Sequence, residues 1–282
     1  MNYTVPSLSI VFMAISALVG IAIPVVLLLV FRKKFKASYL SFFIGCAVFI
    51  VFAMIIEAFL HRLILPSEIG SKIQGNIWLF AIYGGLMAGL FEETGRFTAY
   101  KTILRKKYAN DGNALMCGAG HGGFEAFSML TLTMVSYLSM AIMLNNGMSG
   151  TLTAGVQDET ARKTLEASFA MLAQTPSASY MIGVVERICA VALHISLSVL
   201  VWFAAKDRGR FWLFPLSIAL HAFVDAIAVV LSKNGTKAWI IEVVLYVMVA
   251  CCVVLARVAW KKAASCPSSP NTVNEPVKSS EA

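Results

Sequence analysis

Residues 91–96 read FEETGR, so two adjacent carboxylates, Glu92 and Glu93, are followed by the guanidinium group of Arg96. They come directly after residues 78–90, a run without a single charged side chain. A carboxylate can act as a general base toward water, and a guanidinium four residues along a helix can hold that carboxylate ionised and oriented. The segment therefore predicts acid–base chemistry inside an apolar helix.

Histidines and carboxylates recur in three further apolar segments. Two segments, HGGFE and HAFVD, place a histidine four residues before a carboxylate, and a third places a glutamate eight residues before a histidine. Spacings of four and eight put both side chains on one face of a helix. The residues are His121 and Glu125, His221 and Asp225, and Glu186, Arg187 and His194. Four helices with one polar stripe each predict a shared polar interior.

The elements that must position these residues are transmembrane helices. The chain has 282 residues, of which 59% are hydrophobic and 13% charged, and its mean hydropathy is +0.77. This composition predicts an all-α, polytopic integral membrane protein. A helix needs about 20 apolar residues to cross the bilayer. By that rule we expect about seven spans, near 6–31, 38–62, 76–103, 113–144, 178–205, 211–232 and 238–260. One transmembrane domain, 1–262, would be followed by a disordered Ser/Pro-rich cytoplasmic tail, 263–282.

The basic residues predict the orientation of the chain in the cell membrane. They concentrate in the loops 31–36, 101–108, 206–210 and 261–262 and are sparser in the opposite loops. The positive-inside rule places the richer set in the cytoplasm, so we expect the N-terminus outside and the C-terminus inside. The net charge of +8 is then explained by topology, and no nucleic-acid partner is expected.

Ionisable side chains in the bilayer interior cost about 2.5–3.5 kcal/mol each, so they must pair, bind a metal or line a wet cavity. Counted from the cytoplasmic helix ends, Glu93, His121, His194 and His221 fall in one layer, roughly 12–17 Å deep. Histidine and carboxylate side chains in this ratio suit one Zn²⁺ with an open coordination position. A water bound there would be acidified, and a neighbouring carboxylate would accept its proton. Such a site hydrolyses amides.

Two weaker features leave alternatives open, and a third predicts the position of two polar residues. The segment 158–172 predicts an amphipathic helix that either lies on the outer membrane surface or is an ordinary loop helix. The glycines of CGAGHGG, 117–123, either allow close helix packing or break the helix as the span begins. Glu57 and His61 lie near the outer end of a span, where we expect them to snorkel toward water.

The set EETGR, GAGHGGFE, ER followed by His, and HAFVD resembles the YhfC-type family of intramembrane metalloproteases over about residues 1–260. It is more distantly similar to CAAX prenyl proteases, bacteriocin-processing enzymes and PrsW-like proteases, in the third to sixth spans only. The wider group has the motif EExxxR, whereas here Arg96 stands one residue closer to the glutamates. It also has a Phe four residues before the first histidine, where this chain has Cys117.

The resemblance implies roles for particular residues. Glu92 and Glu93 match the glutamates that activate water in the wider group, with Arg96 beside them. His121 and His221 match its metal-binding histidines, and Asp225 matches a ligand or orienting residue. His194 lies outside the group's motifs, but its depth makes it the expected third ligand, with a glutamate of the pair as competitor. Glu125, Glu186 and Arg187 are expected to surround the ligands, and Arg187 is expected to form an ion pair.

The leading hypothesis is a zinc-dependent intramembrane endopeptidase. Its substrate would be a membrane-embedded peptide or a lipid-anchored protein. The alternative is a proton- or ion-coupled transporter that uses the same buried Glu, His and Asp layer as a relay. A tightly bound divalent metal distinguishes the two, because a proton relay needs none.

Overall fold

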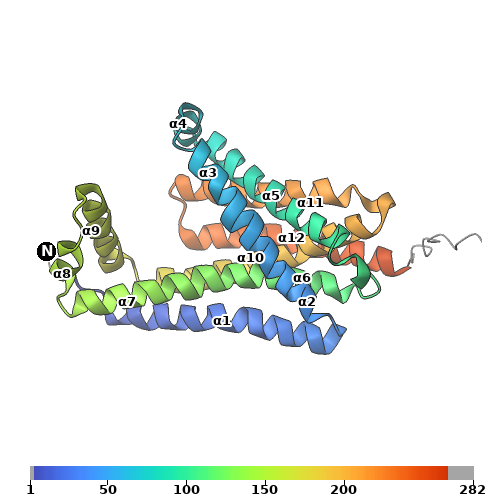
Figure 1. The fold of residues 1–282 in the computed structure, drawn as a ribbon, viewed down its shortest axis with the longest axis horizontal. Helices are drawn as coiled ribbons and strands as arrows, with labels where there is room; N and C mark the ends of the chain where they lie inside the picture. The colour runs from blue at the N-terminus through green and yellow to red at the C-terminus, as the bar shows by residue number, and fades with distance from the viewer. Residues whose placement is uncertain (1–2, 266–282) are drawn as a thin grey trace, which may run out of the picture.

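The structure is a computed structural model that describes residues 3–265, and within this range every regular element is helical (Figure 1). The predicted all-α class is confirmed. The tail predicted for 263–282 falls almost wholly outside the described residues, and the last helix continues to Ser265. The main helices are α1 (Ser7–Phe35), α2 (Tyr39–Val48), α5 (Ile77–Lys101), α6 (Gly112–Ala126), α7 (Thr133–Asn145), α10 (Ala178–Lys206), α11 (Leu213–Lys233) and α12 (Ala238–Ser265).

Six helical segments of the described range are long and apolar enough to cross a membrane. A seventh is reached when α4 (Glu68–Gln74) and α5, which meet at 110°, are taken together. The glutamates of FEETGR lower the hydropathy of α5, which explains why this helix does not qualify by itself. The chain is therefore a multi-pass membrane protein, in agreement with the prediction of about seven spans.

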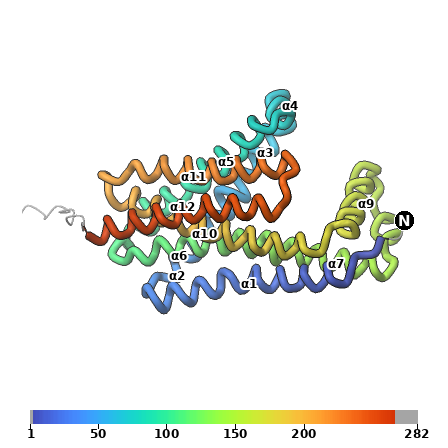
Figure 2. The backbone as a smooth tube through the Cα atoms, turned by 180° about the vertical axis from the view of Figure 1, so that it is seen from behind, coloured from blue at the N-terminus to red at the C-terminus, as the bar shows by residue number. Residues whose placement is uncertain are grey.

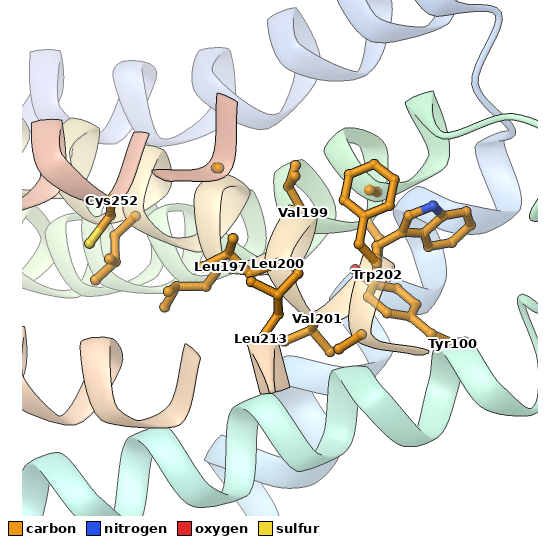
Figure 3. Close-up of a cluster of buried hydrophobic side chains, with 14 of the residues drawn as sticks. Tyr100, Leu197, Val199, Leu200, Val201, Trp202, Leu213 and Cys252 are labelled. Carbon is orange, nitrogen blue, oxygen red and sulfur yellow. The ribbon is translucent and has the colours of Figure 1, made fainter. Parts of the chain in front are cut away.

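Helix α10 is the centre of the bundle. In its most apolar window 78% of the residues are buried, against 17–28% in the other five single candidates. Figure 3 shows Leu197, Leu200 and Trp202 of this helix in one cluster with Tyr100 of α5 and Leu213 of α11. A helix that is apolar on all sides packs against neighbours on all sides. Polar groups in this buried stretch of α10, such as His194, are consequently enclosed by other helices.

Glycines let the helices around α10 approach closely. Gly85 and Gly89 of α5 abut the backbone of α11, and a Cβ atom on Gly89 would lie 2.6 Å from the carbonyl oxygen of Ile218. On α6, a Cβ atom on Gly118 would lie 2.7 Å from Cα of Ile195 in α10. Small residues at four-residue spacing are typical of tight helix packing in membranes. Of the two alternatives for CGAGHGG, close packing is confirmed, because α6 remains α-helical throughout this segment.

Irregular backbone occurs in two spans, the one that contains α2 and the one that contains α6. A π-helical segment, η1 (Phe49–Glu57), joins α2 to α3 (Ala58–Ile64), and a second, η3 (Phe127–Leu132), joins α6 to α7. Both lie next to ionisable residues of the interior: η1 ends at Glu57, and η3 begins two residues after Glu125. Segments of π-helix often occur at functional sites. The wider turn rotates the side chains that follow it about the helix axis.

The predicted amphipathic helix is present as α9 (Glu159–Gln174). Its apolar stripe does not face a membrane surface. Phe169 and Leu172 are fully buried in a cluster with Met13 of α1 and Leu144 of α7. This cluster holds α9 against the end of the bundle where the chain begins (Figure 2). The loop-helix alternative is the one that the packing supports.

Candidate metal centre

Four helices bring six ionisable side chains together in the interior. Glu92, Glu93 and Arg96 come from α5, His121 from α6, His194 from α10 and His221 from α11. All six are buried, with at most 6% of their surface exposed. The close α5–α11 and α6–α10 contacts bring these side chains together, so the predicted polar interior exists.

One oxygen atom lies at the centre of this group. Oε2 of Glu92 is 2.7 Å from Nε2 of His121, 3.8 Å from Nδ1 of His194 and 4.0 Å from Nε2 of His221. Three imidazoles from three helices thus present a nitrogen to a single carboxylate oxygen. Neither the spacing nor the depth of the residues in the sequence could specify which glutamate takes this place.

Glu93 has a different task, although it is the next residue. Its Oε1 accepts hydrogen bonds from Nη1 of Arg96 and from Nδ1 of His221, the latter at 2.8 Å. A carboxylate only accepts, so Nδ1 of His221 carries a proton, and in the neutral ring that a metal ligand requires the lone pair is then on Nε2. Glu93 therefore orients His221 with Nε2 toward Glu92.

His194 is held in the same manner by a carboxylate on another helix. Its Nε2 lies 2.5 Å from Oε2 of Glu125, while its Nδ1 faces Nη2 of Arg96 at 2.7 Å. Because a guanidinium only donates, Nδ1 is the nitrogen with the lone pair and Nε2 carries the proton. Glu125 thus orients His194 so that its lone pair accepts the N–H of Arg96, 3.8 Å from Oε2 of Glu92.

Arg187 connects this arrangement to the outer residues. It contacts Oε1 of Glu125 and Oε1 of Glu186, each at 2.5 Å. The expected ion pair of Arg187 is present, and its partner on the neighbouring helix is Glu125. Among the described residues Glu186 forms no ion pair with the three histidines, and it is half exposed, since 44% of its side-chain surface is accessible.

Arg96 is the cation that balances the glutamate pair. It is fully buried, it contacts Glu93 through Nη1, and its Nη2 lies 3.4 Å from Oε2 of Glu92. The shift of Arg96 relative to the EExxxR spacing does not separate it from the glutamates. Arg96 is four residues from Glu92 and three from Glu93, and residues three and four apart on a helix share a face, so it reaches both glutamates.

Asp225 lies at the accessible side of the centre. Its Oδ2 is 3.5 Å from Nε2 of His221, the nitrogen with the lone pair, and 38% of its side-chain surface is exposed. Asp225 consequently stands on the same side of His221 as Glu92, opposite Glu93.

Glu57 is a residue of this region that the sequence did not predict. We expected it to snorkel toward water, but the structure buries it at the end of η1, so that expectation is wrong. Its Oε1 accepts a hydrogen bond from Nε2 of His61 at 3.1 Å, and Nδ1 of His61 bonds to the hydroxyl of Tyr83 at 2.7 Å. Glu57 also interacts electrostatically with Glu92 and His221. The π-helical turn could not be read from an uninterrupted apolar sequence.

The donor set fits a metal ion. Glu92, His194 and His221 each offer one ligand atom, and these atoms lie within 4.8 Å of one another. Two histidines and a carboxylate form a donor set of catalytic zinc sites, and carboxylates typically orient such histidines from behind, as Glu93 and Glu125 do here. Nδ1 of His121 and Oε2 of Glu93 are also buried without a hydrogen-bond partner. The group includes His194 together with Glu92 of the competing glutamate pair, and of the predicted ligands it lacks His121 and Asp225.

Comparisons with known proteins identify the family of this chain. The sequence model of the YhfC intramembrane metalloprotease family matches residues 19–245. The chain is 36% identical over 228 residues, 80% of its own length and 86% of the other's, to an uncharacterized membrane protein of Bacillus subtilis (strain 168), YhfC. No solved structure matches the chain. The described site residues all lie within the matched range, and the chain belongs to the YhfC intramembrane metalloprotease family.

Proposed function

We propose that this protein is a zinc-dependent intramembrane endopeptidase. The observation that carries the proposal is the position of Oε2 of Glu92, which lies 2.7–4.0 Å from a nitrogen atom of each of three buried imidazoles. A carboxylate at the meeting point of three histidines is the arrangement that a metallopeptidase needs for its base. The family to which the chain belongs supports the same reaction class.

The histidines would hold the metal through the three nitrogens that face Oε2 of Glu92, which are Nδ1 of His194, Nε2 of His221 and Nε2 of His121. Metal binding there would replace the hydrogen bond that Nδ1 of His194 accepts from Arg96 and the one that Nε2 of His121 donates to Glu92. When bound, zinc supplies a Lewis acid that polarises the scissile carbonyl group and acidifies water. Asp225, close to Nε2 of His221, is a further candidate ligand on the accessible side.

Glu92 is the proposed general base. Of the two glutamates, Glu93 is fully buried and its Oε1 is occupied by Arg96 and His221, so it serves to orient His221. Glu92 takes a proton from the attacking water, and the same carboxyl group then returns the proton to the leaving amine. Arg96 forms a buried ion pair with Glu92 and so supplies the positive charge that balances this carboxylate.

The substrate class follows from where these residues lie. The site is formed by the interior stretches of membrane-spanning helices, so we propose a membrane-embedded peptide or a lipid-anchored protein as substrate. With the orientation that the basic loops favour, cleavage would occur from the cytoplasmic side. A membrane transporter remains the alternative, but no observation specific to transport supports it.

The test compares metal content and cleavage in the same preparations. We expect about one zinc per chain by mass spectrometry of wild-type protein purified without chelator, and none in the His194→Ala/His221→Ala variant. In cells, new N-termini of membrane proteins should appear with the wild type and be absent with Glu92→Gln. Glu159→Gln is the matched control, because Glu159 is an exposed residue of α9 that forms a surface ion pair with Lys163. Zinc-free wild-type protein would refute the proposal.

A further inference from the structure

A basic pocket lies at one membrane end of the bundle, between two loops. It has a volume of about 450 Å³ and is formed where α1 passes into α2 and where α5 passes into α6. The starts of α2 and α6 lie at the same end of the molecule (Figure 2). The volume is within the roughly 300–1,000 Å³ of small-molecule sites. None of its described lining residues is acidic. Four cations line it, namely Arg32, Lys36, Lys106 and Lys107.

Two asparagines fix the walls of this basic pocket. Oδ1 of Asn113 accepts the backbone N–H of Ser38 at 2.8 Å, while its Nδ2 donates to the carbonyl oxygen of Lys107 at 3.1 Å. Nδ2 of Asn110 donates to the carbonyl oxygen of Lys36 at 3.2 Å. Lys36 has a positive φ of 52°, a conformation that lysine seldom adopts unless its surroundings hold it. The two loops are therefore clamped together with the basic residues on their rim.

The four cations of the basic pocket have no carboxylate partner among residues 3–265. In the part of the chain that the structure describes, no ion pair involves any of the four cations. The carboxylates near this end are paired elsewhere: Asp111 with Lys206 at 2.7 Å and Asp207 with Arg210 at 3.2 Å. Four cations around one concave surface repel one another, and an anion between them would relieve that repulsion.

We propose that the basic pocket binds the phosphate group of a net-anionic phospholipid headgroup. Guanidinium and ammonium groups are the usual protein ligands of phosphate. The pocket lies where transmembrane helices end, which is the depth of lipid headgroups. Tyr39, with 47% of its surface exposed, stands at the rim beneath the guanidinium of Arg32 and gives an apolar surface for the glycerol part of the lipid. The inference is independent of the proposed peptidase activity.

Native mass spectrometry of the purified full chain in detergent tests the proposal. Phosphatidylglycerol and phosphatidylcholine with the same acyl chains are titrated in, and the bound lipids are counted. The pocket variant is Lys36→Gln/Lys106→Gln/Lys107→Gln. The matched control is Lys33→Gln/Lys261→Gln/Lys262→Gln, which removes the same charge at the same membrane end outside the pocket. Equal melting temperatures establish that both variants are folded.

We expect the wild type to prefer phosphatidylglycerol, and the pocket variant to lose at least about tenfold in affinity for it, since each cation near an anionic lipid surface contributes about 1 kcal/mol. The control should stay close to wild type. Equal losses in the two variants, or no preference over phosphatidylcholine, would overturn the proposal.

A second arm with soluble glycerol 3-phosphate identifies the source of the phosphate group. Displacement of bound phosphatidylglycerol by millimolar amounts of this compound would show that the pocket recognises the headgroup and support the proposal. Pocket-dependent binding of glycerol 3-phosphate without any binding of phosphatidylglycerol would overturn the assignment to a lipid.

Discussion

Nδ1 of His221 in α11 lies 2.8 Å from Oε1 of Glu93 in α5, and the same oxygen accepts a hydrogen bond from Arg96. The contact links two helices whose backbones touch at Gly85 and Gly89. It fixes which nitrogen of His221 is available to a metal, and it separates the functions of two adjacent glutamates. Substitution of one glutamate should therefore have a different effect from substitution of the other.

Replacement of Glu93 by Gln should weaken metal binding without abolishing it. The amide oxygen can still accept the N–H of His221, but the charge that pairs with Arg96 is lost. Substitutions of groups that orient a metal ligand typically cost about 10–100-fold in metal affinity. A titration with a competing zinc chelator measures this loss. Unchanged affinity would show that Glu93 does not act through His221.

Replacement of Glu92 by Gln should leave zinc binding intact and abolish cleavage. The introduced amide has nearly the same shape as the carboxylate but cannot accept a proton from water, and loss of a general base lowers the rate by about 10²–10⁴-fold. We expect close to one zinc per chain together with a loss of the wild-type cleavage products. Loss of the zinc in this variant would instead make Glu92 a metal ligand, as the grouping of Glu92, His194 and His221 also allows.

The sequence predicted the helical class, the number of crossings and the residues that meet. These follow from hydropathy and from polar spacings of four and eight residues, because the period of a helix leaves one face for such residues. It also placed His194 among the candidates by depth alone, and the structure puts His194 next to Arg96 and Glu125. Whether His121, His194 and His221 all bind the metal stays a prediction.

Other features could not be predicted because they depend on contacts between helices. The π-helical turn that buries Glu57 is set by how α2, α5 and α6 pack, and an apolar run such as FIVFAMIIE does not mark it. The different tasks of Glu92 and Glu93 depend on which one faces α11 and which one faces the centre. The apolar stripe of α9 suits a membrane surface and a protein surface equally, and only the neighbouring α1 and α7 decide between them.

Replacement of Arg187 by Leu should destabilise the fold. Arg187 is the cation that offsets Glu125 and Glu186, and the side chain of Glu125 is only 17% exposed. Removal of one partner of a buried ion pair costs about 3–5 kcal/mol, because the other charge is left without compensation. A drop in melting temperature in detergent measures this effect.

The double variant Glu125→Leu/Arg187→Leu should recover much of that stability. It should nevertheless bind zinc more weakly than the wild type, since His194 loses the carboxylate that orients it. An Arg187→Leu variant as stable as the wild type would show that the ion pair is not needed for folding.

Two adjacent glycines of α5 allow helix packing to be tested without any change in a site residue. A Cβ atom on Gly85 would collide with the backbone carbonyl of Ala222, next to His221, whereas a Cβ atom on Gly84 would meet no atom within 4 Å. Gly85→Ala should push α5 and α11 apart, lower the melting temperature and weaken zinc binding. Gly84→Ala should be neutral or stabilising by up to about 1 kcal/mol, because alanine favours the helix over glycine. Equal behaviour of the two variants would mean that the close approach of α5 and α11 does not position Glu93 against His221.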